Sequence, residues 1–308
     1  MQMDRFSKGI KVWADTQARL LPELRLRTDI SKETVTPVDK RAIVLVEPRP
    51  HPALEFVLRN FRYFLPSWRV ILVHGTENER FVKEVVSKVH GTFEFVNCGV
   101  NDLPAKAYNT LFTRPKFWTS LGDLEWVLIA QTDTMLLKPA ETPLEELIEK
   151  KLHFVGAPWN FSCGVCGGPL DGGCAHMIDQ AVVASLAPDM VGNGGLSLRH
   201  VPSMIAALDR FHLEAAVVRE LVAKWGSTPD SASALRGTTN EDVFFCKAFK
   251  EMGLQLADRA TGLQFAVEQI APFAWNPVSD GPLSLGAHKP WAYLPDKLVK
   301  GMFDRVSL

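Results

Sequence analysis

The sequence lacks the apolar segments that are typical of membrane and exported proteins. No run in its 308 residues approaches the roughly 18 to 20 consecutive apolar residues that a membrane-spanning helix needs. Residues 1–8 contain no apolar core of signal-peptide length. An excess of one charge is also missing, because 34 Lys and Arg oppose 35 Asp and Glu. We therefore expect a soluble cytoplasmic protein with no nucleic-acid partner and no membrane span, in which any anionic ligand is bound locally.

Two common phosphate-binding signatures are absent as well. No G-x-G-x-x-G follows the first predicted strand, and no G-x-x-x-x-G-K-[ST] occurs in the chain. These absences exclude the dinucleotide fingerprint and the P-loop. If the protein binds a phosphorylated ligand, another group must contact the phosphates, and a metal ion held by a carboxylate is the simplest candidate.

Cysteine is scarce, and the five residues are an odd number, which argues against a disulfide framework. Cys98 and Cys246 lie in apolar segments and are expected to be core thiols. The other three form with a histidine the pattern C-x2-C-x7-C-x-H, made by Cys163, Cys166, Cys174 and His176. These side chains could close a tetrahedral zinc site, but the x7 spacing is shorter than in most zinc modules. We favour ordinary loop thiols over structural zinc.

The apolar pattern from residue 41 onward predicts an α/β fold. Four apolar runs of strand length alternate with three segments of helical spacing. The strands are expected at 42–46, 70–74, 92–96 and 126–130, and the helices at 54–64, 79–89 and 105–121, with an interruption at Pro115. Alternation of this kind is typical of a mostly parallel, Rossmann-type central sheet with helices on both faces. Residues 1–40 are expected to form an N-terminal arm with a helical stretch at 10–26, followed by a single domain over 41–308.

Polar residues stand where the predicted parallel strands end. Asp133 follows the apolar run 126–130, Glu47 and Arg49 follow the first strand, and His74 ends the second. Ligands of open α/β sheets bind outside the carboxyl ends of the strands, so Asp133 is placed to hold a cation or a phosphate-bound metal. The alternative is a turn aspartate that caps the next element.

The second half of the chain is less regular but contains three polar segments. Residues 192–199 join a glycine-rich turn to a short strand, and the glycines permit positive φ and close approach of the backbone to a ligand. Asn240 is a predicted N-cap, followed by Glu241 and Asp242 in the first turn of an apolar helix. Capping alone would explain these acids. His288 and Lys289 stand in a loop, where a histidine is more often a hydrogen-bonded residue than a ligand.

The order of five short motifs resembles that of the GT-A-fold glycosyltransferases. The motifs are Gln131-Thr-Asp133, Asn193-Gly-Gly195, Asn240-Glu-Asp242, Phe265-Ala-Val-Glu268 and His288-Lys-Pro-Trp291. More narrowly, the chain resembles a little-characterised GT-A-like family that carries a domain-of-unknown-function label. The resemblance covers about residues 41–295. It implies a GT-A-like fold with a nucleotide-binding half at 41–140 and an irregular acceptor and catalytic half at 141–308.

The resemblance also implies ligand-binding roles for individual residues. GT-A enzymes hold a divalent metal with Asp-x-Asp at a strand end, and Gln131 here takes the place of the first acid, which keeps an oxygen ligand but removes a charge. Asp133 and His288 are the implied ligands of Mn2+ or Mg2+, and Lys289 is an implied contact of the diphosphate. The full set expected to bind the nucleotide sugar is Glu47, Arg49, His74, Gln131, Asp133, Asn193, Gly194, Gly195, Lys289 and Trp291.

By the same resemblance, the expected activity is transfer of a sugar from a nucleotide sugar, with UDP as the default base, to a carbohydrate or glycoconjugate hydroxyl. Asp242 is the expected base of an inverting reaction, and Glu241 is the expected contact of the sugar or acceptor. One alternative is a sugar-phosphate nucleotidyltransferase, but residues 46–50 lack the glycine-rich loop of such enzymes. Another is a non-catalytic carbohydrate-binding protein, which the substitution at Gln131 favours.

Overall fold

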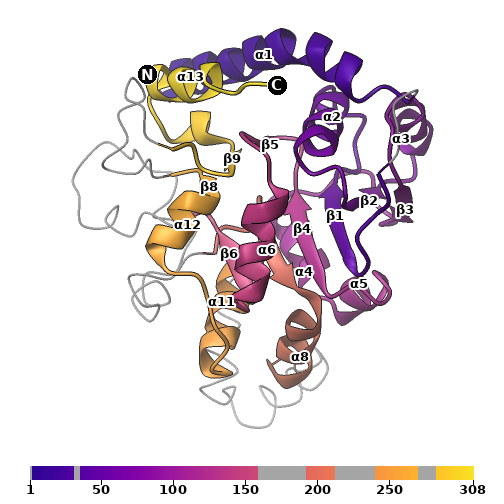
Figure 1. The fold of residues 1–308 in the computed structure, drawn as a ribbon. Coiled ribbons are helices and arrows are strands. Elements are labelled where there is room, and N and C mark those ends of the chain that lie inside the picture. Colours follow the sequence, from indigo (N-terminus) through magenta and orange to yellow (C-terminus); the bar gives the residue numbers. More distant parts are fainter. Residues whose placement is uncertain (1, 31–34, 159–191, 212–239, 270–281) are drawn as a thin grey trace.

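A computed structural model describes residues 2–30, 35–158, 192–211, 240–269 and 282–308 (Figure 1). Its main sheet has six strands in the order β3-β2-β1-β4-β7-β6. Their bounds are β1 Arg41–Val46, β2 Arg69–His74, β3 Phe93–Asn97, β4 Trp126–Ala130, β6 Phe154–Gly156 and β7 Ser197–His200. The first four are parallel, whereas β7 is antiparallel to both of its neighbours. The expectation of an α/β fold with a mostly parallel central sheet is confirmed.

Both faces of this sheet are covered, because successive strand residues point to opposite sides. Ile43 and Leu45 of β1 belong to one buried cluster together with residues of helices α2 (Leu54–Phe64), α6 (Glu141–Glu149) and α13 (Asp296–Asp304). Ala42 and Val44 belong to a second cluster with residues of α4 (Ala105–Phe112), α5 (Pro115–Thr119), α8 (Val201–Phe211) and α11 (Glu241–Glu251). This arrangement explains why the buried parts of β1, β2 and β4, apart from the terminal His74 of β2, are continuous apolar runs without polar alternation.

The helices described in the domain are α2 Leu54–Phe64, α3 Glu79–Val86, α4 Ala105–Phe112, α5 Pro115–Thr119, α6 Glu141–Glu149, α8 Val201–Phe211, α11 Glu241–Glu251, α12 Arg259–Phe265 and α13 Asp296–Asp304. Helix α2 has its expected bounds and α3 ends three residues earlier than expected, whereas α6, α8, α12 and α13 were not predicted. The predicted helix over 105–121 is two helices, because Pro115 cannot donate the hydrogen bond that would continue the first and instead starts the second.

A second, three-stranded sheet was not expected from the sequence. It has the order β5-β9-β8, made by Thr134–Leu136, Gly286–His288 and Ala266–Val267. Strand β5 follows β4 after a three-residue turn and pairs antiparallel with β9, with Thr134 opposite His288. The small sheet therefore brings the C-terminal histidine to the carboxyl end of β4.

The N-terminal segment is a long helix, α1 Gln2–Arg27, that packs on the domain. It contacts α2, α13 and the short 3-10 helix η2 Pro290–Ala292, and Figure 1 shows α1 and α13 together along one edge of the molecule. Its buried residues Leu20 and Leu24 belong to the domain core. Within the ranges that the structure describes, no helix combines the length and apolar character needed to cross a bilayer.

Candidate functional site

A cavity of about 380 Å³ lies at the carboxyl ends of β1 and β4. Its walls come from six segments: the ends of β1 and β4, one side of α4, the 193–195 turn before β7, the start of α11 and the end of β9. Most of the predicted site residues line it, namely Glu47, Arg49, Gln131, Asp133, Asn193, Gly194, Gly195, Glu241, Asp242, His288 and Lys289. The fold thus brings into one cavity residues that are up to 242 positions apart in the chain.

Polar side-chain atoms of Gln131, Asp133 and His288 face one another in this cavity. The Nε2 atom of His288 is 3.1 Å from Gln131 Oε1 and 3.5 Å from Asp133 Oδ1. The β5–β9 pairing fixes this contact, and the backbone N–H of Lys289 donates to the carbonyl of Asp133 at 2.9 Å. One third of the Asp133 side chain is exposed, so the cluster is open to the cavity.

The charges around Asp133 favour its ionised form. Burial alone would raise the pKa of its carboxyl group, but the neighbouring positive charges of His288 and Lys289 outweigh burial and hold this pKa at about 2. Burial opposes protonation of His288, yet the Asp133 and Glu268 carboxylates raise the pKa of its imidazole above the ordinary value. Asp133 is therefore an anion across the physiological pH range.

This cluster fits a divalent cation. Asp133 Oδ1 is buried and has no hydrogen-bond partner in the part of the chain that the structure describes. Two oxygens and an imidazole nitrogen face one another, and only a shared proton or a cation can satisfy all three. Within the described ranges no group of three or more His, Cys, Asp or Glu side chains is arranged to hold a metal. The third ligand atom would instead be the Gln131 amide oxygen, since oxygen ligands suit Mg2+ and Mn2+.

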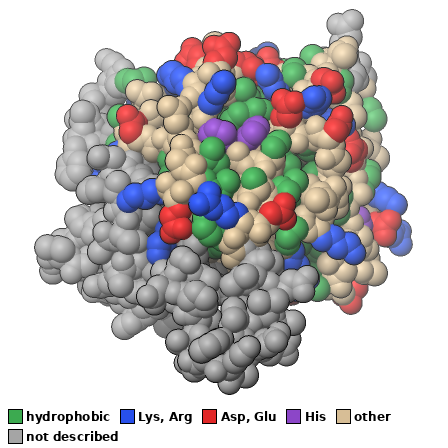
Figure 2. All heavy atoms as spheres, turned by 90° about the horizontal axis from the view of Figure 1, so that it is seen from below, with side chains coloured by type: hydrophobic (Ala, Val, Ile, Leu, Met, Phe, Trp, Pro, Cys, Tyr) green, Lys and Arg blue, Asp and Glu red, His purple; other side chains and the backbone are tan. Residues whose placement is uncertain are grey.

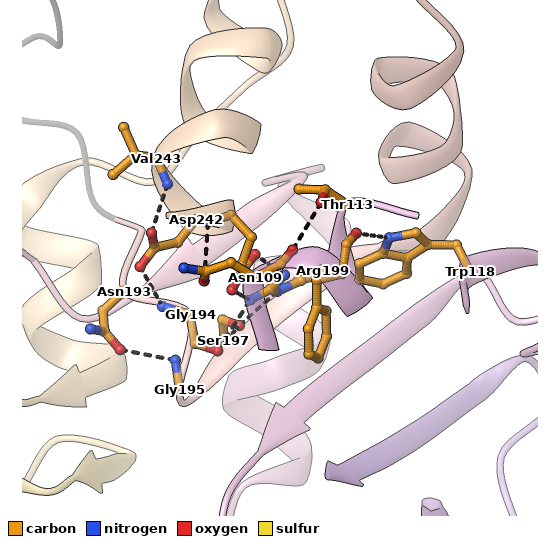
Figure 3. A network of polar contacts seen from close by, with 12 residues as sticks. Asn109, Thr113, Trp118, Asn193, Gly194, Gly195, Ser197, Arg199, Asp242 and Val243 are labelled. Atoms are coloured by element: carbon orange, nitrogen blue, oxygen red, sulfur yellow. Dashed lines mark hydrogen bonds and ion pairs between the residues drawn. The ribbon is translucent and has the colours of Figure 1, made fainter. Parts of the chain in front are cut away.

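Asp242 lies in the same cavity, at the start of α11. Its Oδ2 accepts from the Gly194 backbone N–H at 3.1 Å, and its Oδ1 accepts from the Val243 N–H at 2.8 Å (Figure 3). Burial and the negative charge of Glu241 raise the pKa of Asp242 to about 7, against the opposing effect of these N–H groups and Arg199. A carboxylate with a pKa near neutrality is suited to accept a proton.

Glu241, the expected contact of the sugar or acceptor, lines the cavity and is also held by a buried partner. It forms a buried bidentate ion pair with Arg199, with N–O distances of 2.7 and 2.8 Å, and the two side chains are 2% and 0% exposed. The guanidinium lies over the rings of Phe112 and Phe154, at 5.0 and 4.8 Å from their centroids. Glu241 thus fixes the start of α11 to Arg199 of β7. Its negative charge also raises the pKa of Asp242, which lines the cavity.

Arg199 was missed as a site residue by the sequence analysis. Its Nη2 also donates to the Gly194 carbonyl at 3.1 Å, while the N–H of Gly194 donates to Asp242. The backbone of one residue, Gly194, therefore links the buried ion pair to the carboxylate in the cavity (Figure 3). Its position at the end of a Leu-Ser-Leu-Arg strand could have been noticed, but the pattern gives no sign of burial.

The two glycines of the 193–195 turn line the cavity and pack against side chains of the site. Neither has positive φ, so left-handed backbone does not require glycine here. A β-carbon on Gly194 would overlap Glu241, and one on Gly195 would overlap the His288 ring. The backbone of the turn therefore approaches the side chains of Glu241 and His288 closely, and a larger residue at either position would push these side chains away.

The predicted N-cap position of α11 is confirmed at Asn240, but without a capping hydrogen bond from the side chain. Its Oδ1 instead accepts from Asn109 Nδ2 of α4 at 3.3 Å. Asn109, with Tyr108, lines the cavity and was not predicted as a site residue.

At the end of β1, Glu47 and Arg49 form a hydrogen-bonded ion pair with each other. Arg49 donates to both Glu47 oxygens at 2.8 and 3.1 Å, and Thr132 Oγ1 donates to Glu47 Oε2 at 2.8 Å. Glu47 is therefore a structural anchor between the ends of β1 and β4. Arg49 is half-exposed and extends along the cavity wall.

Two predicted binding residues lie elsewhere. His74 is buried and its Nδ1 is 2.7 Å from the Gly75 carbonyl, outside the residues that line the cavity. Trp291 also does not line the cavity, because it stacks on Trp13 of α1 with ring centroids 4.7 Å apart. Cys246 is buried as expected, whereas Cys98 is only half-buried. The candidate zinc residues of the 163–176 loop lie outside the described residues.

Comparison with known protein families assigns the chain to one of them. Residues 97–288, more than half of the sequence, match the family described as Protein of unknown function (DUF5672). The chain therefore belongs to this family. The matched region begins at the end of β3 and ends at His288, so it includes Gln131, Asp133 and Asp242. No curated protein matches the sequence.

Proposed function

We propose that the protein is a metal-assisted glycosyltransferase that moves a sugar from a nucleotide sugar, with a UDP-sugar favoured, to an acceptor hydroxyl. The observation that carries this proposal is one cavity with two chemically distinct centres. Gln131, Asp133 and His288 offer three ligand atoms that face one another. Asp242, with a pKa of about 7, stands across the 193–195 turn.

The residues around the first centre suit a nucleoside diphosphate. A bound Mn2+ or Mg2+ would neutralise the diphosphate as the glycosidic bond breaks. The ligands would be Asp133, His288 and Gln131. Lys289, directly after His288 on the cavity wall, adds a positive charge for the phosphate oxygens.

The second centre accounts for the proton of the acceptor. The acceptor oxygen forms its new bond to the anomeric carbon while its proton passes to the Asp242 carboxylate. The electron pair of the broken bond leaves with the nucleoside diphosphate. Asp242 is oriented for this role by the N–H groups of Gly194 and Val243. A base that acts on the acceptor in this way supports inversion at the anomeric carbon.

A non-catalytic carbohydrate-binding protein is the second candidate function, because Gln131 supplies an amide where a second metal-binding acid is expected. A single assay separates the two. Purified protein is incubated with a panel of nucleotide sugars and Mn2+, and release of nucleoside diphosphate is measured. We expect release that requires Mn2+ and is lost in Asp133→Ala but kept in Asp123→Ala, whose side chain is 78% exposed. Donor binding without any turnover in the wild-type protein would favour the binder.

A further inference from the structure

Glu268 is a buried acid at the back of the candidate site. It follows β8 directly, and β8 runs parallel to β9, so Glu268 comes alongside His288. The Glu268 side chain is 1% exposed, and its Oε1 lies 3.1 Å from His288 Nδ1. Its Oε2 has no hydrogen-bond partner within the described ranges. Glu268 does not line the cavity and reaches it only through the imidazole.

Burial of this carboxylate is costly. An ionised carboxylate in the interior is normally paired and fully hydrogen-bonded, and a half-satisfied one destabilises the fold. A neutral side chain of similar shape would fill the same space without that cost. The position is therefore better explained by the effect of the carboxylate on His288 than by packing.

The surrounding hydrogen bonds define which nitrogen of His288 carries its proton. Asn193 Oδ1 accepts from the Gly195 N–H at 3.0 Å, which identifies it as an oxygen, and it lies 3.0 Å from His288 Nδ1. Nδ1 thus faces two acceptors, Asn193 Oδ1 and Glu268 Oε1. Two acceptors, at 3.0 and 3.1 Å, place a proton on Nδ1. Nε2 also faces two oxygens, at 3.1 and 3.5 Å, so either a proton or a cation must lie between Nε2 and these oxygens.

With the proton on Nδ1, the lone pair of the neutral ring is on Nε2. That atom faces Gln131 Oε1 and Asp133 Oδ1. A carboxylate behind a metal-binding histidine fixes the tautomer and orientation of the ring and makes the ligand nitrogen more basic. The contacts satisfy this pattern: Glu268 lies against Nδ1 of His288, and Nε2 of the same ring faces Asp133.

We infer that Glu268 is a positioning residue, which holds His288 in the Nδ1–H tautomer with Nε2 directed at a divalent cation on Gln131 and Asp133. This inference rests on the proposed function, since it concerns the same metal. It assigns a role to a residue that touches neither the cavity nor a substrate. Glu268 acts through His288 alone, and Asn193 supports the ring from the same side.

The test measures binding of Mn2+ alone to the purified full chain, by the decrease of the free Mn2+ electron paramagnetic resonance signal. We expect Glu268→Ala to lower Mn2+ affinity by about 10-fold to 100-fold. Glu268→Gln should lose less, because its amide oxygen still accepts from Nδ1. Glu251→Ala, at an exposed position of α11, is the control and should bind like the wild type. Wild-type affinity in a folded Glu268→Ala would overturn the inference.

A second readout does not depend on variants of Glu268. Nitrogen-15 spectra of the wild-type histidines, assigned with His288→Gln, report the tautomer of the neutral ring with and without diamagnetic Mg2+. With Mg2+ bound we expect the Nδ1–H form, and a ring that keeps its proton on Nε2 at saturating Mg2+ would overturn the inference even if Glu268→Ala fails to fold. A wild-type protein that binds no Mn2+ would remove the metal from the proposed function, and the inference would fall with it. Equal binding by the wild type and Glu268→Ala would overturn only the inference.

Discussion

The imidazole of His288 packs against Gly195 so closely that a β-carbon at position 195 would overlap the ring. The neighbouring Gly194 is packed in the same way against Glu241. Two adjacent glycines thus place the candidate metal ligand and the buried ion pair on the two sides of one turn. The relative position of His288 and Asp242 depends on this turn, and small changes in it should separate the two centres.

Substitution of Gly195 by alanine should displace His288. The added methyl group cannot fit beside the ring, and overpacking of this kind costs about 1 to 3 kcal/mol of folding free energy. We expect a lower midpoint of denaturant unfolding and weaker Mn2+ binding, measured on the same preparation. Unchanged Mn2+ affinity in Gly195→Ala would show that the ring position is not needed for the metal.

Replacing either Arg199 or Glu241 alone should destabilise the fold strongly, whereas replacing both together should cost much less. Removing one partner leaves the other charge buried, which typically costs about 3 to 5 kcal/mol. We expect Arg199→Met and Glu241→Leu each to lower the free energy of unfolding by this amount, and the double variant to recover a large part. Chemical denaturation of all four proteins measures the coupling. Additive losses in the double variant would contradict the pairing.

A pair of histidines away from the cavity should affect stability at acid pH. His153 and His200 form this pair, with ring centroids 5.0 Å apart and both Nδ1 atoms within 2.8 Å of the Ser203 hydroxyl. Figure 2 shows one face of the molecule, on which two histidine side chains lie next to each other among hydrophobic and charged groups. Burial, followed by the charge of His153, lowers the pKa of His200 to about 4.

The sign of the pH effect follows from this lowered pKa. Between about pH 6.5, the ordinary histidine pKa, and the folded value of about 4, the unfolded chain binds a proton that the folded chain does not. Stability is therefore lost as the pH falls through this window. We expect His200→Gln to lose less stability than the wild type between pH 7.5 and pH 4.5 in urea unfolding. Identical losses in the two proteins would remove His200 as the source.

The strands were predictable because local sequence determines them. Each parallel strand is a short apolar run between polar segments, and the structure reproduces all four expected strands to within one residue at each end. Asp133 was placed at the ligand edge of the sheet for the same reason, whereas only the resemblance to a known family put the start of α11 in the site. These features need no knowledge of contacts between distant segments.

The remaining parts of the site depend on distant contacts. Strands β5 and β9 have three residues each and meet across about 150 positions, so no local pattern indicates that Asp133 lies beside His288. Arg199 looks like a surface charge at a strand end until Glu241 is brought beside it. Trp291 resembled a ligand contact because of its motif, but packing against α1 decides its position.

The Asp242 assignment can be tested by one isosteric change. Asp242→Asn keeps the size of the side chain, but it cannot take a proton from the acceptor. Its single oxygen can accept from only one of the Gly194 and Val243 N–H groups, which now donate to separate oxygens. We expect turnover to fall by roughly 100-fold or more with donor affinity preserved. Transfer rate and nucleotide affinity are measured side by side. A variant within a few fold of the wild type would remove Asp242 as base and favour a retaining mechanism.

The most direct test of the account is whether nucleotide-sugar binding depends on a metal held by Asp133. Melting temperatures are measured with UDP-, GDP-, CMP- and dTDP-sugars, with and without Mn2+, for the wild type, Asp133→Ala and the exposed control Asp123→Ala. Because a ligand that binds only the folded state raises its apparent stability, we predict a rise for a UDP-sugar that needs Mn2+. Asp123→Ala should keep this rise and Asp133→Ala should lose it. The same rise without Mn2+ or in Asp133→Ala, or no rise with any donor, would contradict the account.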